Sequence, residues 1–292
     1  MKRYPLTIIL SFVILFFSCT TQHPSRKPVV VTSISVYADI VHAIAGSTCT
    51  VQSLVTGNEN PHTFDLTGDK AKLVHDADII VFNGLGLEGW GGQVIQGLDR
   101  KKTHFISVAD SLAGSPLLVH GDNPHIWMDP RIGVLIVQTL VKPLQHLVPD
   151  SAAAFQSRAD QYISDLRDLY RDINIKLEPI HGKKVIAQTP GLDYFFTAVQ
   201  MHRTAVIVDN PGTEPSARHM TELIDSLNTG NMYAIARLPQ FSEKLPDTLE
   251  KETGVPVTLM SPLINGAPYV DTYIDLLWFN ADQIMMVFSP ES

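Results

Sequence analysis

Two short segments of the sequence each place a histidine directly after an Asn-Pro pair. The first reads NPHTFD over residues 60–65 and the second reads NPHIWMDP over residues 123–130, so an aromatic residue and an aspartate follow each histidine. A proline fixes the backbone ahead of the histidine and so restricts where its imidazole points. Imidazole nitrogen is a common ligand of Zn²⁺ and other transition metals. The two copies indicate that His62 and His125 are aimed at one site; the alternative is that each histidine only ends a loop.

The composition limits the class of protein. Of the 292 residues 45% are hydrophobic and 18% are charged, which is typical of a soluble globular protein with room for about two domains. The formal net charge is −8, whereas nucleic-acid grooves carry basic stripes, so we expect no nucleic-acid partner.

The N-terminus predicts the compartment. Lys2 and Arg3 precede an apolar run over residues 6–17, which has about the length of a signal-peptide core and is short for a membrane span. The run ends in FFSC and resembles a bacterial lipoprotein signal, in which the cysteine becomes the lipidated N-terminus. We therefore expect a signal peptide over 1–19, lipidation of Cys19 and a polar tether over 20–28. An uncleaved anchor is the alternative, and both place the rest of the chain outside the cytoplasmic membrane.

Cysteine use agrees with this interpretation. Cys19 and Cys49 are the only cysteines in the sequence. If Cys19 carries lipid, Cys49 has no intramolecular partner, so we expect no disulfide.

Strand and helix patterns alternate on both sides of one long helical segment. Continuous apolar and β-branched runs predict buried strands, and helical spacing lies between them. The predicted strands are 29–35, 77–84 and 104–108 in the first part, and 183–189, 204–210, 232–238 and 255–263 in the second. A further helix is expected after Pro130.

The long segment runs from Asp150 to Glu178. Small or apolar residues recur there at steps of three and four, which predicts one buried helical face made of Phe155, Ala159, Tyr162, Leu166, Leu169, Ile173 and Leu177. At 1.5 Å per residue such a helix is on the order of 40 Å long, enough to cross a whole domain.

These patterns predict an α/β fold of two lobes with parallel sheets, joined by one long rigid helix and separated by a cleft. We place the N-terminal lobe at residues 29–149, the linker helix at 150–179 and the C-terminal lobe at 180–292. Ligands of open α/β folds bind at the carboxyl ends of the strands, so the cleft is the expected binding site.

The motifs also resemble those of a known family. SLVTGNENPHTFD, DNPHIWMDP and APYVDTYIDLLWFNADQI resemble the metal-ligand segments of bacterial zinc- and manganese-binding lipoproteins, the solute-binding components (A-I cluster) of ABC-type metal importers. The resemblance covers about residues 29–284. It implies that His62 and His125 are metal ligands and that Asp271 completes the site from the other lobe.

One segment departs from the family pattern. The family's third ligand, a histidine or glutamate, falls within VIAQTPGLDYFF, where alignment on the aromatic pair puts Thr189 at the ligand position. Thr189, Gln188 and Glu214 are the weak candidates to replace it, because hydroxyl and amide oxygens are poorer zinc donors than imidazole or carboxylate.

We therefore predict an extracytoplasmic, lipid-anchored protein that captures Zn²⁺ or Mn²⁺, with Fe²⁺ as a further candidate. The resemblance implies that it delivers the metal to an ABC permease and its ATPase. The main alternative is a degenerate family member that binds a non-metal ligand or acts as a surface adhesin. An enzyme is the other rival, since three protein ligands plus water is the layout of a catalytic zinc. However, the sequence has no H-E-x-x-H motif, and Glu214 is the one carboxylate placed as a general base, so we expect no enzyme.

Overall fold

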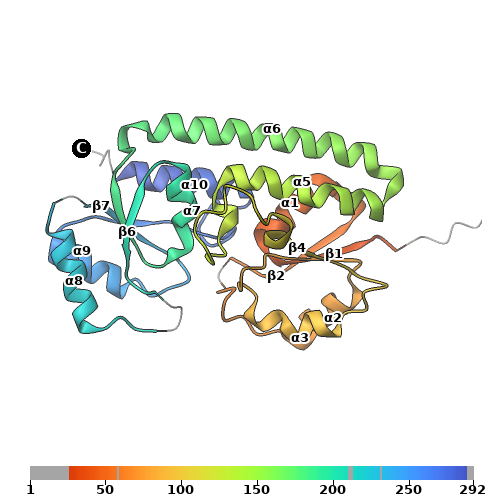
Figure 1. The fold of residues 1–292 in the computed structure, drawn as a ribbon, viewed down its shortest axis with the longest axis horizontal. Coiled ribbons are helices and arrows are strands. Elements are labelled where there is room, and N and C mark those ends of the chain that lie inside the picture. The colour runs from red at the N-terminus through yellow and green to blue at the C-terminus, as the bar shows by residue number, and fades with distance from the viewer. Residues whose placement is uncertain (1–25, 58, 210–212, 231, 288–292) are drawn as a thin grey trace, which may run out of the picture.

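The computed structural model describes residues 26–57, 59–209, 213–230 and 232–287 (Figure 1). The predicted signal peptide and Cys19 lie outside these residues. Within them, no helix has the length and apolar character needed to cross a membrane. Cys49 is buried, and it forms no disulfide with the residues that the structure describes.

The first sheet belongs to the N-terminal lobe and is entirely parallel, with strand order β2-β1-β3-β4. Its strands are β1 (Val29–Ile34), β2 (Thr50–Val55), β3 (Ile79–Phe82) and β4 (His104–Ser107). The accompanying helices are α1 (Ser35–Ala45), α2 (Gly68–Asp76), α3 (Gly92–Gly97), α4 (Val108–Ser111) and α5 (Pro130–Leu147). The three strands predicted here and the helix predicted after Pro130 are confirmed.

Strand β2 was missed by the sequence patterns. It lies at the edge of the sheet, and its first four residues are exposed or only partly buried. A strand covered on one side does not need the continuous apolar run that marks a central parallel strand such as β1. The polar residues Thr50, Gln52 and Ser53 interrupt the apolar pattern, and β2 was therefore not predicted.

The second sheet belongs to the C-terminal lobe and repeats the architecture with order β6-β5-β7-β8, again all parallel. Its strands are β5 (Lys184–Ala187), β6 (His202–Val206), β7 (Met232–Arg237) and β8 (Val257–Leu259), and all four were predicted. The helices are α7 (Asp193–Ala198), α8 (Ala217–Leu227), α9 (Lys244–Thr253) and α10 (Tyr273–Met286).

Helix α6 (Ala152–Leu177) is the predicted long helix and runs beside both lobes (Figure 1). It contacts α5 and α1 of the N-terminal lobe and α10 of the C-terminal lobe. Six of the seven predicted face residues are buried; Ile163 takes the place predicted for Tyr162. Tyr162 is partly buried instead, and its hydroxyl lies 3.2 Å from Oδ2 of Asp39 in α1. The two-lobe prediction is thus confirmed.

Polar contacts tie the two lobes together beside this helix. The carboxylate of Asp39 accepts a hydrogen bond of 2.9 Å from the backbone N–H of Tyr273 at the start of α10. The Tyr273 hydroxyl donates to the carbonyl of Trp127, and the indole N–H of Trp127 donates to the carbonyl of Pro262 at 2.7 Å. Trp127 and Tyr273 are fully buried, so these bonds lie within a core that both lobes share.

Candidate metal centre

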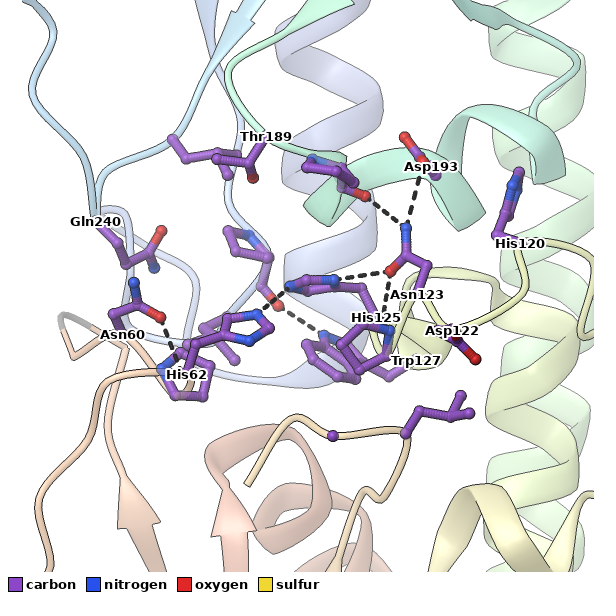
Figure 2. A pocket seen from close by; sticks show the side chains of 18 of the residues that line it. Asn60, His62, His120, Asp122, Asn123, His125, Trp127, Thr189, Asp193 and Gln240 are labelled. Carbon is purple, nitrogen blue, oxygen red and sulfur yellow. Dashed lines mark hydrogen bonds between the residues drawn. The ribbon is translucent and has the colours of Figure 1, made fainter. Parts of the chain in front are cut away.

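A cavity of about 530 Å³ lies between the lobes (Figure 2). Its lining residues come after the carboxyl ends of strands from both sheets. From the N-terminal lobe they include Asn60 and His62 after β2, and Asn123 and His125 after β4 and α4. From the C-terminal lobe they include Thr189 after β5, Asp209 after β6, Gln240 after β7 and Pro262 after β8. In parallel sheets these ends share one edge, and here the two edges face each other. The cavity is therefore where the α/β architecture predicts a ligand.

The repeated Asn-Pro-His triplet forms the same turn twice. In the first copy the Asn60 side-chain oxygen accepts a hydrogen bond of 3.0 Å from the backbone N–H of His62. In the second copy the Asn123 oxygen accepts from the backbone N–H of His125, also at 3.0 Å. An asparagine that binds the backbone two residues on makes an Asx turn, and the intervening proline presets its backbone. The Asn-Pro-His triplet therefore occurs twice because each copy forms the same Asx turn.

The two turns bring the imidazoles together. The Nε2 atoms of His62 and His125 are 3.4 Å apart and the ring centroids are 5.3 Å apart. In a tetrahedral site with Zn–N bonds of 2.0–2.1 Å, two nitrogen ligands are separated by about 3.3 Å. The observed separation therefore matches that of two ligands of one cation, and it also allows a hydrogen bond between neutral rings.

Asn123 contacts the ring of its histidine as well as the backbone. Its side-chain oxygen lies 2.9 Å from Nδ1 of His125. Since this oxygen only accepts, we assign the ring proton to Nδ1, which leaves the Nε2 lone pair directed at His62. A metal-binding histidine is commonly held by an acceptor at its other nitrogen in this way.

The environment keeps both rings neutral. Burial lowers the pKa of His62 below its usual value. Burial, with a smaller contribution from the neighbouring His62 ring, lowers the pKa of His125 to about 3. Because metals bind the neutral imidazole, no proton has to leave either ring at neutral pH before a metal binds.

The loop that carries His125 is held from both lobes. The side-chain amide of Asn83, after β3, donates to the carbonyl of Pro124 at 2.9 Å. From the other side, the Asn123 amide donates to the carbonyl of Pro190 at 2.9 Å and lies 3.3 Å from Oδ2 of Asp193. Asp193 is in turn paired with Arg203, whose Nη2 lies 2.7 Å from Oδ2. This carboxylate is thus already engaged by a guanidinium.

The positions expected to supply a third ligand are dispersed. Thr189 lines the cavity, and its hydroxyl accepts from the N–H of Gly191 at 3.3 Å. Gln188 is buried outside the lining: its amide donates to the carbonyl of Ser242 and its oxygen accepts from the N–H of Leu238. Glu214 and Asp271 are both exposed, and neither lines the cavity.

Within the described ranges, no group of three or more His, Cys, Asp or Glu side chains lies close enough to hold a metal ion. The structure thus brings His62 and His125 together but does not bring Asp271 to them. Asp209 is the carboxylate that reaches the cavity lining from the C-terminal lobe apart from the paired Asp193.

Several supporting residues were not singled out from the sequence. Asn60 and Asn123 are part of the repeated triplet, and an asparagine two residues before a histidine is a recognisable Asx-turn signal. Asn83 and Asp209 each follow a strand end, which is too common a position to mark a site.

Comparison with known proteins identifies the family of this chain. A relative from Thermotoga maritima, described as a putative metal-binding protein, is 31% identical over 97% of this chain and 98% of its own length. The manganese ABC transporter substrate-binding lipoprotein ScaA of Streptococcus gordonii is 23% identical over 97% of each chain. The periplasmic zinc-binding protein TroA of Treponema pallidum has the same fold, with a TM-score of 0.81, 24% identity and coverage of 90% of this chain and 99% of its own.

The family model described as the periplasmic component A of the zinc-uptake complex matches residues 30–287, nearly the whole chain and both lobes. The chain therefore belongs to the ZnuA family of periplasmic zinc-uptake components.

Proposed function

We propose that this protein captures a divalent transition metal, Zn²⁺ or Mn²⁺, outside the cytoplasm and delivers it to an ABC permease. The observation that carries the proposal is the pair of neutral imidazoles, 3.4 Å apart in a cavity between the lobes. Family membership favours metal capture over a non-metal ligand or adhesion as the main activity. Relatives described as zinc- or manganese-binding transport components support either metal as cargo.

We propose His62 and His125 as the metal ligands of the N-terminal lobe. For the C-terminal lobe, the family resemblance implies Asp271, while the cavity lining favours Asp209. A carboxylate from that lobe offsets the charge of the cation, and solvent completes the coordination. An incomplete set of strong protein ligands suits Mn²⁺, which accepts mixed nitrogen and oxygen ligation, as well as Zn²⁺.

The proposal includes the remaining parts of the transport system. Lipidation of Cys19 would hold the protein at the membrane, where a permease and its ATPase receive the metal. We further propose a transport role without catalysis, since members of this family act as binding components of transporters. Loss of fatty-acid labelling in a Cys19→Ser variant tests the anchor separately from the metal site.

Metal analysis of the purified protein tests the capture function. His62→Ala and His125→Ala should each reduce affinity by more than the roughly 10–100-fold that loss of an outer-shell partner costs. His75→Ala, which removes an exposed imidazole on α2, is the matched control and should change nothing. Protein that holds no Zn, Mn or Fe, and takes up none at micromolar concentration, would overturn the proposal.

Parallel titrations of Asp209→Ala and Asp271→Ala identify the carboxylate from the C-terminal lobe. The variant that loses affinity to the extent of the histidine variants marks the ligand. If neither does, neither Asp209 nor Asp271 is a metal ligand.

A further inference from the structure

One end of the N-terminal lobe carries a concentration of positive charge, although the chain as a whole has a formal net charge of −8. A second cavity, of about 560 Å³, is lined there by exposed basic groups: Arg100, Lys101, Lys102, His104, Lys142 and His146. We call these six residues the basic surface. Asp78 is the one acidic residue lining this cavity within the described part of the chain.

The charge of Asp78 is offset by a neighbouring cation. Its carboxylate pairs with Arg26 at 2.8 Å and also accepts from the N–H of Val29 at 2.7 Å. Asp99 lies next to Arg100 in the chain, and its carboxylate accepts from the N–H of Lys101 at 3.0 Å. The basic surface therefore keeps a net positive charge when Asp78 and Asp99 are included.

The basic surface lies at the edge of the sheet away from the metal cavity. His104 begins β4, and Lys142 and His146 lie near the end of α5. Since the strands are parallel, their amino ends form the edge opposite the carboxyl ends that carry His62 and His125. The metal-capture site does not explain this concentration of charge.

The chain enters the fold at the rim of the basic surface. Arg26 is held there by hydrogen bonds to the carbonyl of Asp76 at 3.1 Å and to the carboxylate of Asp78. Cys19 precedes Arg26 by seven residues, and an extended chain spans at most about 3.6 Å per residue, or about 25 Å in all. An anchor at Cys19 would therefore keep Arg26, at the rim of the basic surface, within about 25 Å of the membrane.

We propose that the basic surface docks on the anionic phospholipid headgroups of the membrane from which the tether extends. Lysine ammonium groups on flexible stems suit mobile headgroup phosphates, and each basic residue near such a surface adds attraction. This interaction goes beyond metal capture and draws on the proposed lipid anchor only for proximity. It orients the molecule: the C-terminal lobe, with α9 at its far end, points away from the bilayer (Figure 1).

Amine footprinting of the anchored protein tests the docking. The full-length protein, extracted from membranes with its native N-terminus, is reconstituted in vesicles of phosphatidylcholine alone or with phosphatidylglycerol. Acetylation of Lys101, Lys102 and Lys142 should slow by at least about fivefold in the anionic vesicles and recover at high salt. Lys244 and Lys251, exposed on α9, are internal controls and should react equally in both.

A matched pair of variants separates this surface from general charge. Lys101→Glu/Lys142→Glu removes positive charge from the basic surface, and Lys244→Glu/Lys251→Glu makes the same change in net charge on α9. The protection of Lys102 should be lost in the first variant and retained in the second. Circular dichroism verifies that both are folded.

Three results would overturn the proposal. The first is equal acetylation of the basic surface in both vesicle types, and the second is equal protection of Lys102 in both variants. The third is protection by inorganic phosphate in vesicles without phosphatidylglycerol, which would identify a site for a soluble anion. None of these results depends on metal binding, so failure of the docking and failure of metal capture are distinguishable.

Discussion

Asn123→Ala is the most informative change outside the proposed ligands. The Asn123 side-chain oxygen holds both the backbone N–H of His125 at 3.0 Å and its ring Nδ1 at 2.9 Å. Without that acceptor, the ring can rotate, and its proton can move to Nε2, the nitrogen that we propose as the metal ligand. We therefore expect weaker metal binding even though both imidazoles remain.

The expected loss of metal affinity follows from the role of Asn123 in orienting the ring of His125. Loss of an acceptor that orients a metal-binding histidine typically costs about 10–100-fold in affinity, or about 1.4–2.7 kcal/mol. Competition titrations of Zn²⁺ and Mn²⁺ against a chromogenic chelator measure this directly. Thermal unfolding of the metal-free protein, run in parallel, separates loss of binding from loss of the fold.

The other copy of the triplet supplies the control. The side-chain oxygen of Asn60 accepts from the backbone N–H of His62, and the described part of the chain shows no bond from it to the His62 ring. Asn60→Ala should therefore cost much less affinity than Asn123→Ala. Equal losses in the two variants, or an Asn123→Ala protein within about twofold of the parent, would refute the orienting role.

Two further predictions concern the contacts between the lobes. Burial raises the pKa of Asp39, so its contribution to stability is fully present below the ordinary value of 3.8 and is lost as pH rises through the folded pKa. Asp39→Asn keeps an oxygen acceptor for Tyr273. In denaturant titrations across pH, the unfolding free energy of this variant relative to that of the parent should therefore increase as pH rises. A difference that stays constant with pH would contradict this. Gly133→Ala would place a methyl group 2.6 Å from the Tyr273 hydroxyl oxygen, so we expect a loss of about 1–3 kcal/mol in unfolding free energy, measured by chemical denaturation. Unchanged stability would show that Tyr273 can move aside.

Much of the fold could be predicted because the sheets are parallel. Central strands of such sheets are buried on both faces, and their continuous apolar runs stand out in the sequence. The edge strand β2 lacks that signature and was missed. The periodicity of α6 predicted the buried face but put Tyr162 in the position of Ile163, because a tyrosine can bury its ring and leave its hydroxyl to bond Asp39.

The site could be predicted only in part. A short turn motif fixes each histidine locally, so His62 and His125 were identifiable from their neighbours in the chain. Carboxylates from the C-terminal lobe carry no such local signal, and their distance from the histidines depends on tertiary packing. Asp271 follows a loop in which Asn265 and Tyr269 both adopt positive φ angles, a conformation that sequence patterns do not predict.

Asn123 also connects the metal centre to the arrangement of the lobes. Its oxygen holds His125, while its amide nitrogen holds the carbonyl of Pro190 in the C-terminal lobe at 2.9 Å. Two residues after His125, Trp127 makes a second bond across the lobes, to the carbonyl of Pro262. A cation bound at His125, as we propose, would act on a segment that is bonded to the opposite lobe at both Asn123 and Trp127. Since binding that favours one arrangement shifts the population toward it, we expect metal capture and lobe position to be coupled through this segment.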